Sequence, residues 1–167
     1  MTEHEQQQVF NTWLSAHRGI LFRIIRAYAQ TAMDRDDLFQ EISFQVWKSV
    51  PAFRRESAVT TWLYRIALNT AMSWVRKEKK RNDALESEVK ATLYENSTQE
   101  DDRLTWLYDK ISRLNEIDKS IALLMLDGLS YQEMAVITGL TESNIGVRIN
   151  RMKKNLIEQS KTYHDGI

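Results

Sequence analysis

Apolar residues recur three or four positions apart along most of this chain, and no stretch alternates apolar with polar residues as a strand would. Residues 9–28 show this pattern clearly, which predicts one long amphipathic helix. Acidic residues at 34–37 supply caps and early-turn charges for a second helix, and the only proline, Pro51, ends it. The apolar side of this helix is formed by Leu38, Ile42, Val46 and Trp47. The pattern therefore predicts an all-α protein.

A third helix is expected from Thr61 to Arg81, after a loop at residues 52–60. Thr60 or Thr61 is the expected cap of this helix. Its expected inner face consists of Trp62, Leu63, Ile66, Thr70 and Trp74. The three helices together predict a first domain, residues 1–81.

Residues 82–102 lose the apolar periodicity and are rich in acidic and polar side chains, so we expect a flexible linker there. Two further helical stripes follow, and the second stops at Asp127-Gly128. The first stripe contains Leu104, Leu107, Ile111 and Leu114, and the second contains Ile117, Ile121, Leu124 and Met125. These helices begin a second domain, residues 103–167, so the prediction is two small helical domains joined by a linker.

Residues 129–156 have the pattern of a helix-turn-helix, an arrangement that places its second helix in the major groove of DNA. Ser130 is the expected cap of a short first helix, Gly139 permits the positive φ of the turn, and Thr141 caps a last helix that runs to about residue 161. Three residues are expected on the packed side of the motif: Ala135, Ile145 and Ile149.

This pattern predicts that the last helix reads duplex DNA. Asparagine pairs in bidentate fashion with adenine and valine contacts a thymine methyl group, whereas arginine and lysine bind phosphates. The residues expected to face the major groove are Ser143, Asn144, Val147 and Asn150, and those expected at phosphates are Arg148, Arg151, Lys153 and Lys154. An ordinary helical hairpin with a basic exposed face is the alternative.

Charge is strongly segregated, although the formal net charge of the chain is zero. Residues 54–81 contain eight basic and two acidic residues, a net charge of +6, and residues 82–103 contain two basic and seven acidic residues, a net charge of −5. Attraction to phosphate is local under physiological screening. The basic block therefore indicates a nucleic-acid surface, and the acidic segments indicate a basic protein partner. Charged faces that only keep the protein in solution are the alternative.

The basic helix at residues 61–81 combines cations with an asparagine and follows a loop with an aromatic residue, a composition typical of single-stranded DNA binding. Unstacked bases need surfaces that receive them, and the DNA backbone needs cations beside it. The candidates are Phe53, Arg54, Arg55, residues 57–60, Asn69 and Arg76. Trp62 and Trp74 are instead expected in the core, because apolar residues at helical spacing face inward.

Asp37, Gln40 and Glu41 are expected on one exposed face of the second helix, since residues three and four apart are neighbours on a helix. Such a face suits a basic helix on a partner protein. It is a poor candidate for a paired-carboxylate catalytic site, because the sequence places no histidine, nucleophile or metal-ligand set near it.

Composition argues against several classes of chemistry. The chain has no cysteine, hence no disulfide, thiolate zinc site or cysteine nucleophile, and a reducing cytoplasm is the expected location. Its three histidines join no ligand motif and no glycine-rich phosphate loop is present, so we expect no metal, no cofactor and no enzymatic activity. The polar N-terminus and the lack of a long apolar run predict neither a signal peptide nor a membrane span.

Three segments, in this order and spacing, resemble bacterial RNA polymerase sigma factors, specifically the small two-domain extracytoplasmic-function (ECF) group of the sigma-70 family. They are DLFQE at 37–41, TWLYRIALNTA at 61–71 and the helix-turn-helix at 129–156. The resemblance extends over nearly the whole chain, from about Val9 to Lys161. It implies a non-enzymatic subunit that binds core RNA polymerase, directs it to promoters and helps to open the DNA.

The resemblance also implies roles for single residues. Asp37, Gln40 and Glu41 would dock on the β′ clamp helices of core polymerase, and the β flap is a further expected contact. Asn69 matches a position that lines a pocket for a flipped base of the promoter −10 element. The other residues assigned to the −10 element, from the resemblance or from the composition of the helix, are Phe53, Arg54, Ser57, Ala58, Thr60, Arg65 and Arg76.

For the second domain the resemblance implies duplex reading of the −35 element by the last helix. The acidic linker, residues 82–102, would run through the polymerase toward its RNA exit path and mimic nucleic acid in a basic channel. Many family members have Lys or Arg where this chain has Gly146, which predicts weaker or shifted −35 reading. A recruiting protein is therefore an expected partner, and the resemblance adds an anti-sigma factor as another candidate.

Two other functional classes account for part of the sequence. A stand-alone helix-turn-helix repressor or activator uses the C-terminal half but leaves DLFQE and residues 53–81 without a role. A nucleic-acid-processing enzyme needs clustered metal ligands, which the sequence lacks.

Overall fold

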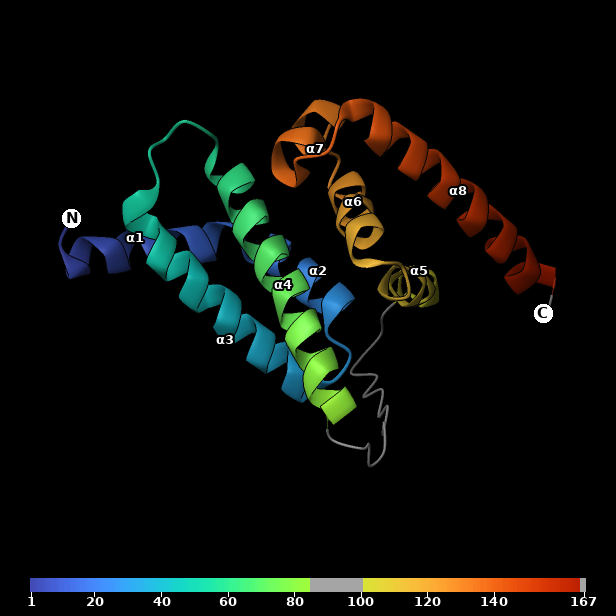
Figure 1. Ribbon diagram of the computed structural model, residues 1–167, viewed down its shortest axis with the longest axis horizontal. Helices are drawn as coiled ribbons and strands as arrows, with labels where there is room; N and C mark the ends of the chain where they lie inside the picture. The colour runs from blue at the N-terminus through green and yellow to red at the C-terminus, as the bar shows by residue number, and fades with distance from the viewer. Residues whose placement is uncertain (85–100, 166–167) are drawn as a thin grey trace. The chain divides into compact units, whose positions relative to one another are not determined.

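The computed structural model describes residues 1–84 and 101–165. Every regular element assigned within these residues is helical, which confirms the predicted all-α class (Figure 1). The chain divides into two compact units, residues 1–100 and 101–167. The described elements of the first unit are α1 (Glu3–Ala16), α2 (Arg18–Tyr28), α3 (Ala32–Ser49), the 3₁₀ turn η1 (Val50–Ala52) and α4 (Val59–Ala84).

The first amphipathic segment forms two helices, so the prediction of one long helix over residues 9–28 is wrong. His17 lies between α1 and α2 with φ −125° and ψ 26°, outside the helical region, while its N–H still donates to the Trp13 carbonyl at 3.1 Å. The two helices bury different amounts of apolar surface: α1 buries only Trp13, whereas α2 buries six residues. The break gives the strongly amphipathic α2 an orientation of its own in the core.

Helix α3 begins one turn earlier than the acidic residues suggested. The Asp34 N–H donates to the Thr31 hydroxyl at 3.1 Å, so Thr31 is the cap and Asp34 is an acid of the first turn. Pro51 lies in η1, directly after the end of the helix, as predicted. The apolar side is confirmed for Leu38, Ile42 and Val46, which are buried, while Trp47 is half-buried.

Helix α4 begins at Val59, because the Ala58 carbonyl already accepts the Trp62 N–H at 3.2 Å. The predicted cap at Thr60 or Thr61 is therefore wrong, since both residues lie inside the helix. The inner face is also rotated from the predicted one, for only two of its five members are buried. The residues that α4 buries against α2 and α3 are Leu63, Tyr64, Ala67, Leu68, Ala71 and Trp74.

The second unit packs α8 against both α6 and α7, with α5 on α6. Its core includes Ile121 and Leu124, as predicted, but the expected first stripe is displaced, since Leu104 is exposed and Tyr108 is buried in its place. In the expected second stripe, Ile117 is exposed and Met125 is half-buried. The described helices of this unit are α5 (Asp102–Ser112), α6 (Glu116–Leu126), α7 (Tyr131–Thr138) and α8 (Glu142–Asp165).

The segment predicted as a linker is helical at the ends that the structure describes. Residues 82–84 continue α4, and Asp101 caps α5 by accepting the Arg103 N–H at 3.0 Å. Residues 85–100 lie outside the described part of the chain. Within that part, no helix is long and apolar enough to cross a membrane.

Candidate nucleic-acid and partner-binding surfaces

The helix-turn-helix forms as its caps and its glycine predict. Ser130 and Glu133 make a reciprocal capping box at the start of α7, with bonds of 3.1 and 2.7 Å. Gly139 ends α7 in the left-handed region at φ 77° and so makes the turn. The Thr141 hydroxyl then accepts the Asn144 N–H at 3.1 Å and caps α8. These contacts fix the angle at which α8 leaves the turn.

One side of α8 is buried and the other is open. Ile145 and Ile149 are fully buried, as predicted, while the side chain of Val147 is 63% exposed. The open side carries the polar and basic residues that the sequence assigned to DNA, and the exposed ones among them are Ser143, Asn144, Asn150, Arg151, Lys153 and Lys154. The arrangement presents a short, mixed surface of amides and cations of the kind that fits a major groove.

Arg148 differs from these residues, because a carboxylate holds it. Its Nη1 donates to Asp118 Oδ1 at 2.8 Å, and the Arg148 side chain is only 24% exposed. Sequence reasoning missed Asp118, which comes from α6 and whose side chain is 8% exposed. Its spacing from Asn115, three residues earlier, is a signal for a helix cap. Nothing in the sequence indicates that the same carboxylate reaches α8.

Gly146 lies beside an aromatic ring of the preceding helix, a neighbour that the sequence does not reveal. A Cβ at this position would lie 3.4 Å from Cε2 of Tyr131, the first residue of α7. This is an ordinary van der Waals distance, so the ring of Tyr131 leaves room for a Cβ at this position. The packing of α7 on α8 therefore does not by itself explain why this chain has glycine where many family members have Lys or Arg.

In the first unit, α4 carries an exposed polar stripe. Arg65, Asn69 and Arg76 are all exposed, and their spacing of four and seven residues puts them on one face of the helix. Arg76 Nε donates to the Met72 carbonyl at 3.3 Å, and no ion pair joins either arginine to another described residue. The basic residues that continue this end of α4, Lys77, Lys79, Lys80 and Arg81, are exposed as well.

The loop before α4 is anchored by its aromatic residue. The Phe53 ring lies between Trp13, at a centroid distance of 5.1 Å, and Trp62, at 5.5 Å. It is half-buried, so the ring contributes mainly to holding the loop and offers less surface to a base than the sequence suggested. Beyond it, Arg54 and Ala58 are exposed, while Ser57 and Thr60 are half-buried.

Trp62 and Trp74 belong to the packing of the first unit, as predicted, although Trp62 is only half-buried. Trp62 Nε1 donates to the Ser49 hydroxyl at 3.1 Å, and Trp74 Nε1 donates to the Asp37 carboxylate at 3.0 Å. The second bond links α4 to the acidic face of α3. Asp37 is therefore exposed to solvent and also accepts a hydrogen bond from Trp74.

On α3, the predicted acidic face is open to solvent. Asp37 and Gln40 are exposed, and Glu41 is half-buried, with its carboxylate accepting from Gln45 Nε2 at 3.3 Å. One turn further on, the exposed Phe44 ring lies 5.5 Å from Lys48 Nζ. We call Asp37, Gln40 and Glu41 the α3 ridge.

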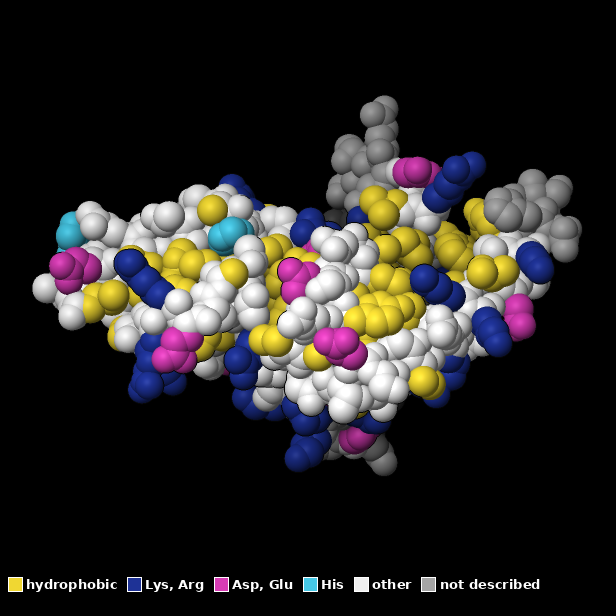
Figure 2. Space-filling view, turned by 90° about the horizontal axis from the view of Figure 1, so that it is seen from above, with side chains coloured by type: hydrophobic (Ala, Val, Ile, Leu, Met, Phe, Trp, Pro, Cys, Tyr) yellow, Lys and Arg dark blue, Asp and Glu magenta, His cyan; other side chains and the backbone are white. Residues whose placement is uncertain are grey.

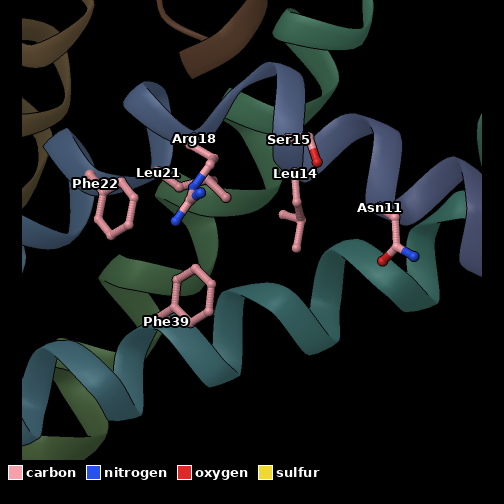
Figure 3. A pocket seen from close by; sticks show the side chains of 7 residues that line it. All are labelled: Asn11, Leu14, Ser15, Arg18, Leu21, Phe22 and Phe39. Carbon is pink, nitrogen blue, oxygen red and sulfur yellow. The ribbon is translucent and has the colours of Figure 1, made fainter.

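An open pocket of about 250 Å³ lies between α1, α2 and α3 (Figure 3). Phe22 and Phe39 stack across it at 6.3 Å between ring centroids, and they are 52% and 37% exposed. The Arg18 guanidinium lies 5.7 Å from the Phe22 centroid. On the face shown in Figure 2, hydrophobic side chains also reach the surface between basic ones. The pocket is an exposed apolar feature with a cationic rim, which is typical of a protein-binding surface.

The pKa of the buried Lys119 differs from the ordinary value of a lysine. Burial in α6 lowers the pKa of Lys119, and the neighbouring Glu116 opposes that effect. Among the described residues, no group of three or more His, Asp or Glu side chains is arranged to hold a metal ion.

Comparison with known families matches both units. Residues 10–81 match Sigma-70 region 2, and residues 104–156 match Sigma-70, region 4. The ECF RNA polymerase sigma-E factor of Haemophilus influenzae (strain ATCC 51907 / DSM 11121 / KW20 / Rd) is 30% identical over 171 residues, which cover 92% of this chain and 90% of the relative. The chain belongs to the ECF group of the sigma-70 family. Members of this group bind RNA polymerase and direct it to promoters, and this sigma factor does the same.

Other relatives agree with this assignment. The ECF RNA polymerase sigma-E factor of Escherichia coli (strain K12) is 30% identical over 162 residues, covering 89% of this sigma factor and 84% of the relative. The sigma-70 family is not a family of enzymes.

Two solved structures share the fold. The sigma factor RpoE of Bartonella quintana, in complex with the anti-sigma factor NepR, has a TM-score of 0.72 at 20% identity, with 93% of this chain and 96% of that chain covered. CnrH, in complex with the cytosolic domain of CnrY, has a TM-score of 0.68 at 19% identity, with 93% and 90% covered.

Proposed function

We propose that this sigma factor performs its task with three surfaces: the α3 ridge binds core RNA polymerase, the loop before α4 and the exposed stripe of α4 capture the single-stranded −10 element, and α8 reads the −35 element as duplex. The observation that carries the proposal is that each candidate set has exposed members and that no member of the three sets is buried in a core.

The α3 ridge suits a basic helix of the polymerase, which we take to be the β′ clamp helices. Gln40 is exposed, and no other described residue engages its side chain in a hydrogen bond. Asp37 is held by Trp74, so it presents a carboxylate of fixed orientation. A fixed carboxylate loses little side-chain entropy on binding. The β flap is a further contact that we propose for the second unit.

The α4 stripe suits a strand that has left the duplex. Extruding a base costs a few kcal/mol, and a site that receives the extruded base converts this cost into sequence-selective opening. Asn69 lies between Arg65 and Arg76 on the exposed face, so an amide is available to a base while cations follow the backbone. Binding energy drives the opening, so we propose that the protein needs no cofactor and is not an enzyme. We place it in the cytoplasm, where the polymerase meets the chromosome.

The decisive experiment is transcription from a set of linear templates with purified core RNA polymerase. We expect this sigma factor to make core polymerase initiate at a fixed position on some of them. A stand-alone helix-turn-helix regulator would leave core polymerase without specific starts, and a nucleic-acid-processing enzyme would degrade the template. Either result would overturn the proposal.

We also propose an anti-sigma factor as a partner, because the two solved relatives are complexes of this kind or with a cytosolic partner domain. The exposed Phe22–Phe39 pair with its Arg18 rim is the candidate contact. A tagged chain and its Phe22→Ser variant would be used to capture partners from the producing cells. We expect a protein that is retained by the natural chain alone and that, once purified, inhibits transcription by the holoenzyme. A captured protein that leaves transcription unchanged would contradict this role.

A further inference from the structure

Asp118 is a buried carboxylate at the place where α6 packs against α8. Three side chains surround it: Asn115 Nδ2 donates to Oδ2 at 2.8 Å, Arg148 Nη1 donates to Oδ1 at 2.8 Å, and Arg151 Nη2 lies 3.8 Å from Oδ2. The α6 cap adds a constraint, since the Asp118 N–H donates to Asn115 Oδ1 at 2.9 Å. The carboxylate is thus fixed on one side by its own helix and contacts two arginines of α8 on the other.

The network continues from Arg148 to the surface. Arg148 Nε donates to Asn144 Oδ1 at 2.8 Å, so one guanidinium joins the buried carboxylate to an exposed asparagine. This bond uses one of the two lone pairs of the Asn144 amide oxygen and sets the orientation of the amide. The NH₂ group and the second lone pair of the oxygen remain available to DNA.

We propose that Asp118 is a positioning residue for −35 recognition, which holds Arg148 and, through Arg148, fixes the orientation of the Asn144 amide. Pairing of an asparagine with a base edge needs its oxygen and its NH₂ group in a set orientation. A fixed Asn144 amide therefore discriminates between base pairs better than one that rotates freely. The inference rests on the proposed −35 role of α8.

The same network changes the electrostatic role of Arg148. Because Asp118 already neutralises it, Arg148 releases little counterion when the helix binds a phosphate backbone. Arg148 is therefore expected to add less sequence-independent affinity than an unpaired arginine would, while it holds the Asn144 amide in one orientation. An ion pair with a purely structural role would stabilise the second unit without changing the salt dependence of DNA binding or the discrimination between base pairs. The two roles therefore predict different results for variants of Asp118.

The test uses the holoenzyme, a promoter duplex whose start site has been mapped, and the same duplex with substituted −35 base pairs. For Asp118→Asn we expect discrimination between cognate and substituted duplexes to fall about tenfold, the size of one lost base contact. We expect the salt dependence of binding to steepen by about one, because the released Arg148 neutralises a phosphate. Asp109→Asn is the matched control, since Asp109 lies in the same unit and pairs at 3.4 Å with Arg113, whose side chain is 70% exposed; it should change neither quantity.

A second variant keeps the test valid if Asp118→Asn lowers the folded fraction. Arg148→Lys retains the charge and can still pair with Asp118, but it has no Nε–H to hold Asn144. We expect it to lose the preference at one base pair, the pair that Asn144→Ala also affects, with an unchanged salt dependence.

Separate outcomes identify which idea fails. A natural holoenzyme that binds cognate and substituted −35 duplexes equally would overturn the proposed −35 role, and the inference with it. If the natural holoenzyme discriminates but Asp118→Asn behaves like Asp109→Asn, only the inference is overturned. The same holds if the natural holoenzyme discriminates and Asn144→Ala leaves that discrimination unchanged.

Discussion

The two helices of this sigma factor that we propose to contact DNA carry their arginines in different ways. On α4, Arg65 and Arg76 are exposed and form no ion pair with another described residue. On α8, Arg148 is held at 2.8 Å by a carboxylate that is itself buried. The two proposed targets differ in the same way. A single strand has a variable path, so adaptable cations suit it, whereas a duplex presents base edges at fixed positions and rewards side chains of fixed orientation.

The difference teaches that basic residues on the solvent side of two helices are not equivalent, because one of them is held by a buried carboxylate. A count of basic residues in the sequence identifies both helices as candidates for DNA binding. On α4 the count agrees with the structure at Arg65 and Arg76, which are exposed and form no ion pair with another described residue. On α8 the count overestimates the number of phosphate contacts, because a buried acid from another helix neutralises one arginine. Each variant below tests one side of this contrast.

The largest expected effect concerns the support of α8. Ile145→Ala removes a fully buried side chain and should lower the free energy of unfolding of the second unit by about 2–5 kcal/mol. Val147→Ala, two residues away and exposed, should change stability by about 0.5 kcal/mol or less while altering −35 reading. Denaturant unfolding of both variants measures the contrast, and an equal loss would show that the described packing of α8 is incorrect.

The next effect separates the polymerase surface from both DNA surfaces. Gln40→Ala combined with Glu41→Ala should weaken binding to core polymerase about tenfold or more, since removing a hot-spot pair costs at least about 1 kcal/mol for each residue. Binding of the full chain to −35 duplex should stay unchanged. Glu3→Ala with Gln7→Ala makes the same residue changes on exposed positions of α1 and should have no effect. Loss of both activities in the α3 variant would indicate misfolding.

A smaller effect is expected at the −10 surface. Asn69→Ala should reduce open-complex formation at the preferred promoter about fivefold to tenfold, with holoenzyme assembly intact, because one base loses its hydrogen-bond partner. Asn82→Ala, an exposed asparagine near the end of the same helix, is the control. Unchanged opening across −10 sequence variants would remove Asn69 from the site.

The salt dependence of duplex binding compares two arginines within α8. Arg151→Gln should lower the slope by about one, because the Arg151 guanidinium is 57% exposed and lies 3.8 Å from Asp118, farther than that of Arg148. Arg148→Gln should lower it by clearly less, because Asp118 already neutralises that guanidinium. If the two variants lower the slope equally, Asp118 does not neutralise Arg148. That result would contradict the proposed contrast between the arginines of α4 and α8.

The smallest effect is a pH dependence of stability. Burial lowers the pKa of Lys119 in the folded state, so between that pKa and 10.5 the unfolded chain binds more protons. The stability of the natural protein relative to Lys119→Met should therefore rise as the pH increases through this window. Urea unfolding at several alkaline pH values measures it, and a relative stability that falls with pH would show the opposite shift.

Much of the fold was predictable, because it depends on local signals. The capping box at Ser130, the left-handed Gly139 and the cap at Thr141 each act within four residues, and the structure has all three as predicted. The end of α3 at Pro51 is local in the same sense. These signals were sufficient to identify the helix-turn-helix and its exposed side.

The failures have a common cause, which is packing between segments far apart in the sequence. The break at His17 and the rotated inner face of α4 depend on how the helices fit together. The contacts of Asp118 with Arg148 and of Tyr131 with Gly146 join residues on different helices. Periodicity specifies which residues share a face, but not which residue of another helix lies opposite.

The most direct test of the proposed division of labour is the reactivity of unpaired thymines toward permanganate at a promoter mapped with this sigma factor. With core polymerase and the natural chain, we predict reactive thymines in the −10 element, weaker reactivity with Asn69→Ala, and none with core polymerase alone. Transcripts that start at the same promoter without reactive thymines in its −10 element, or with equal reactivity for Asn69→Ala, would contradict the role of α4 in capturing the open strand.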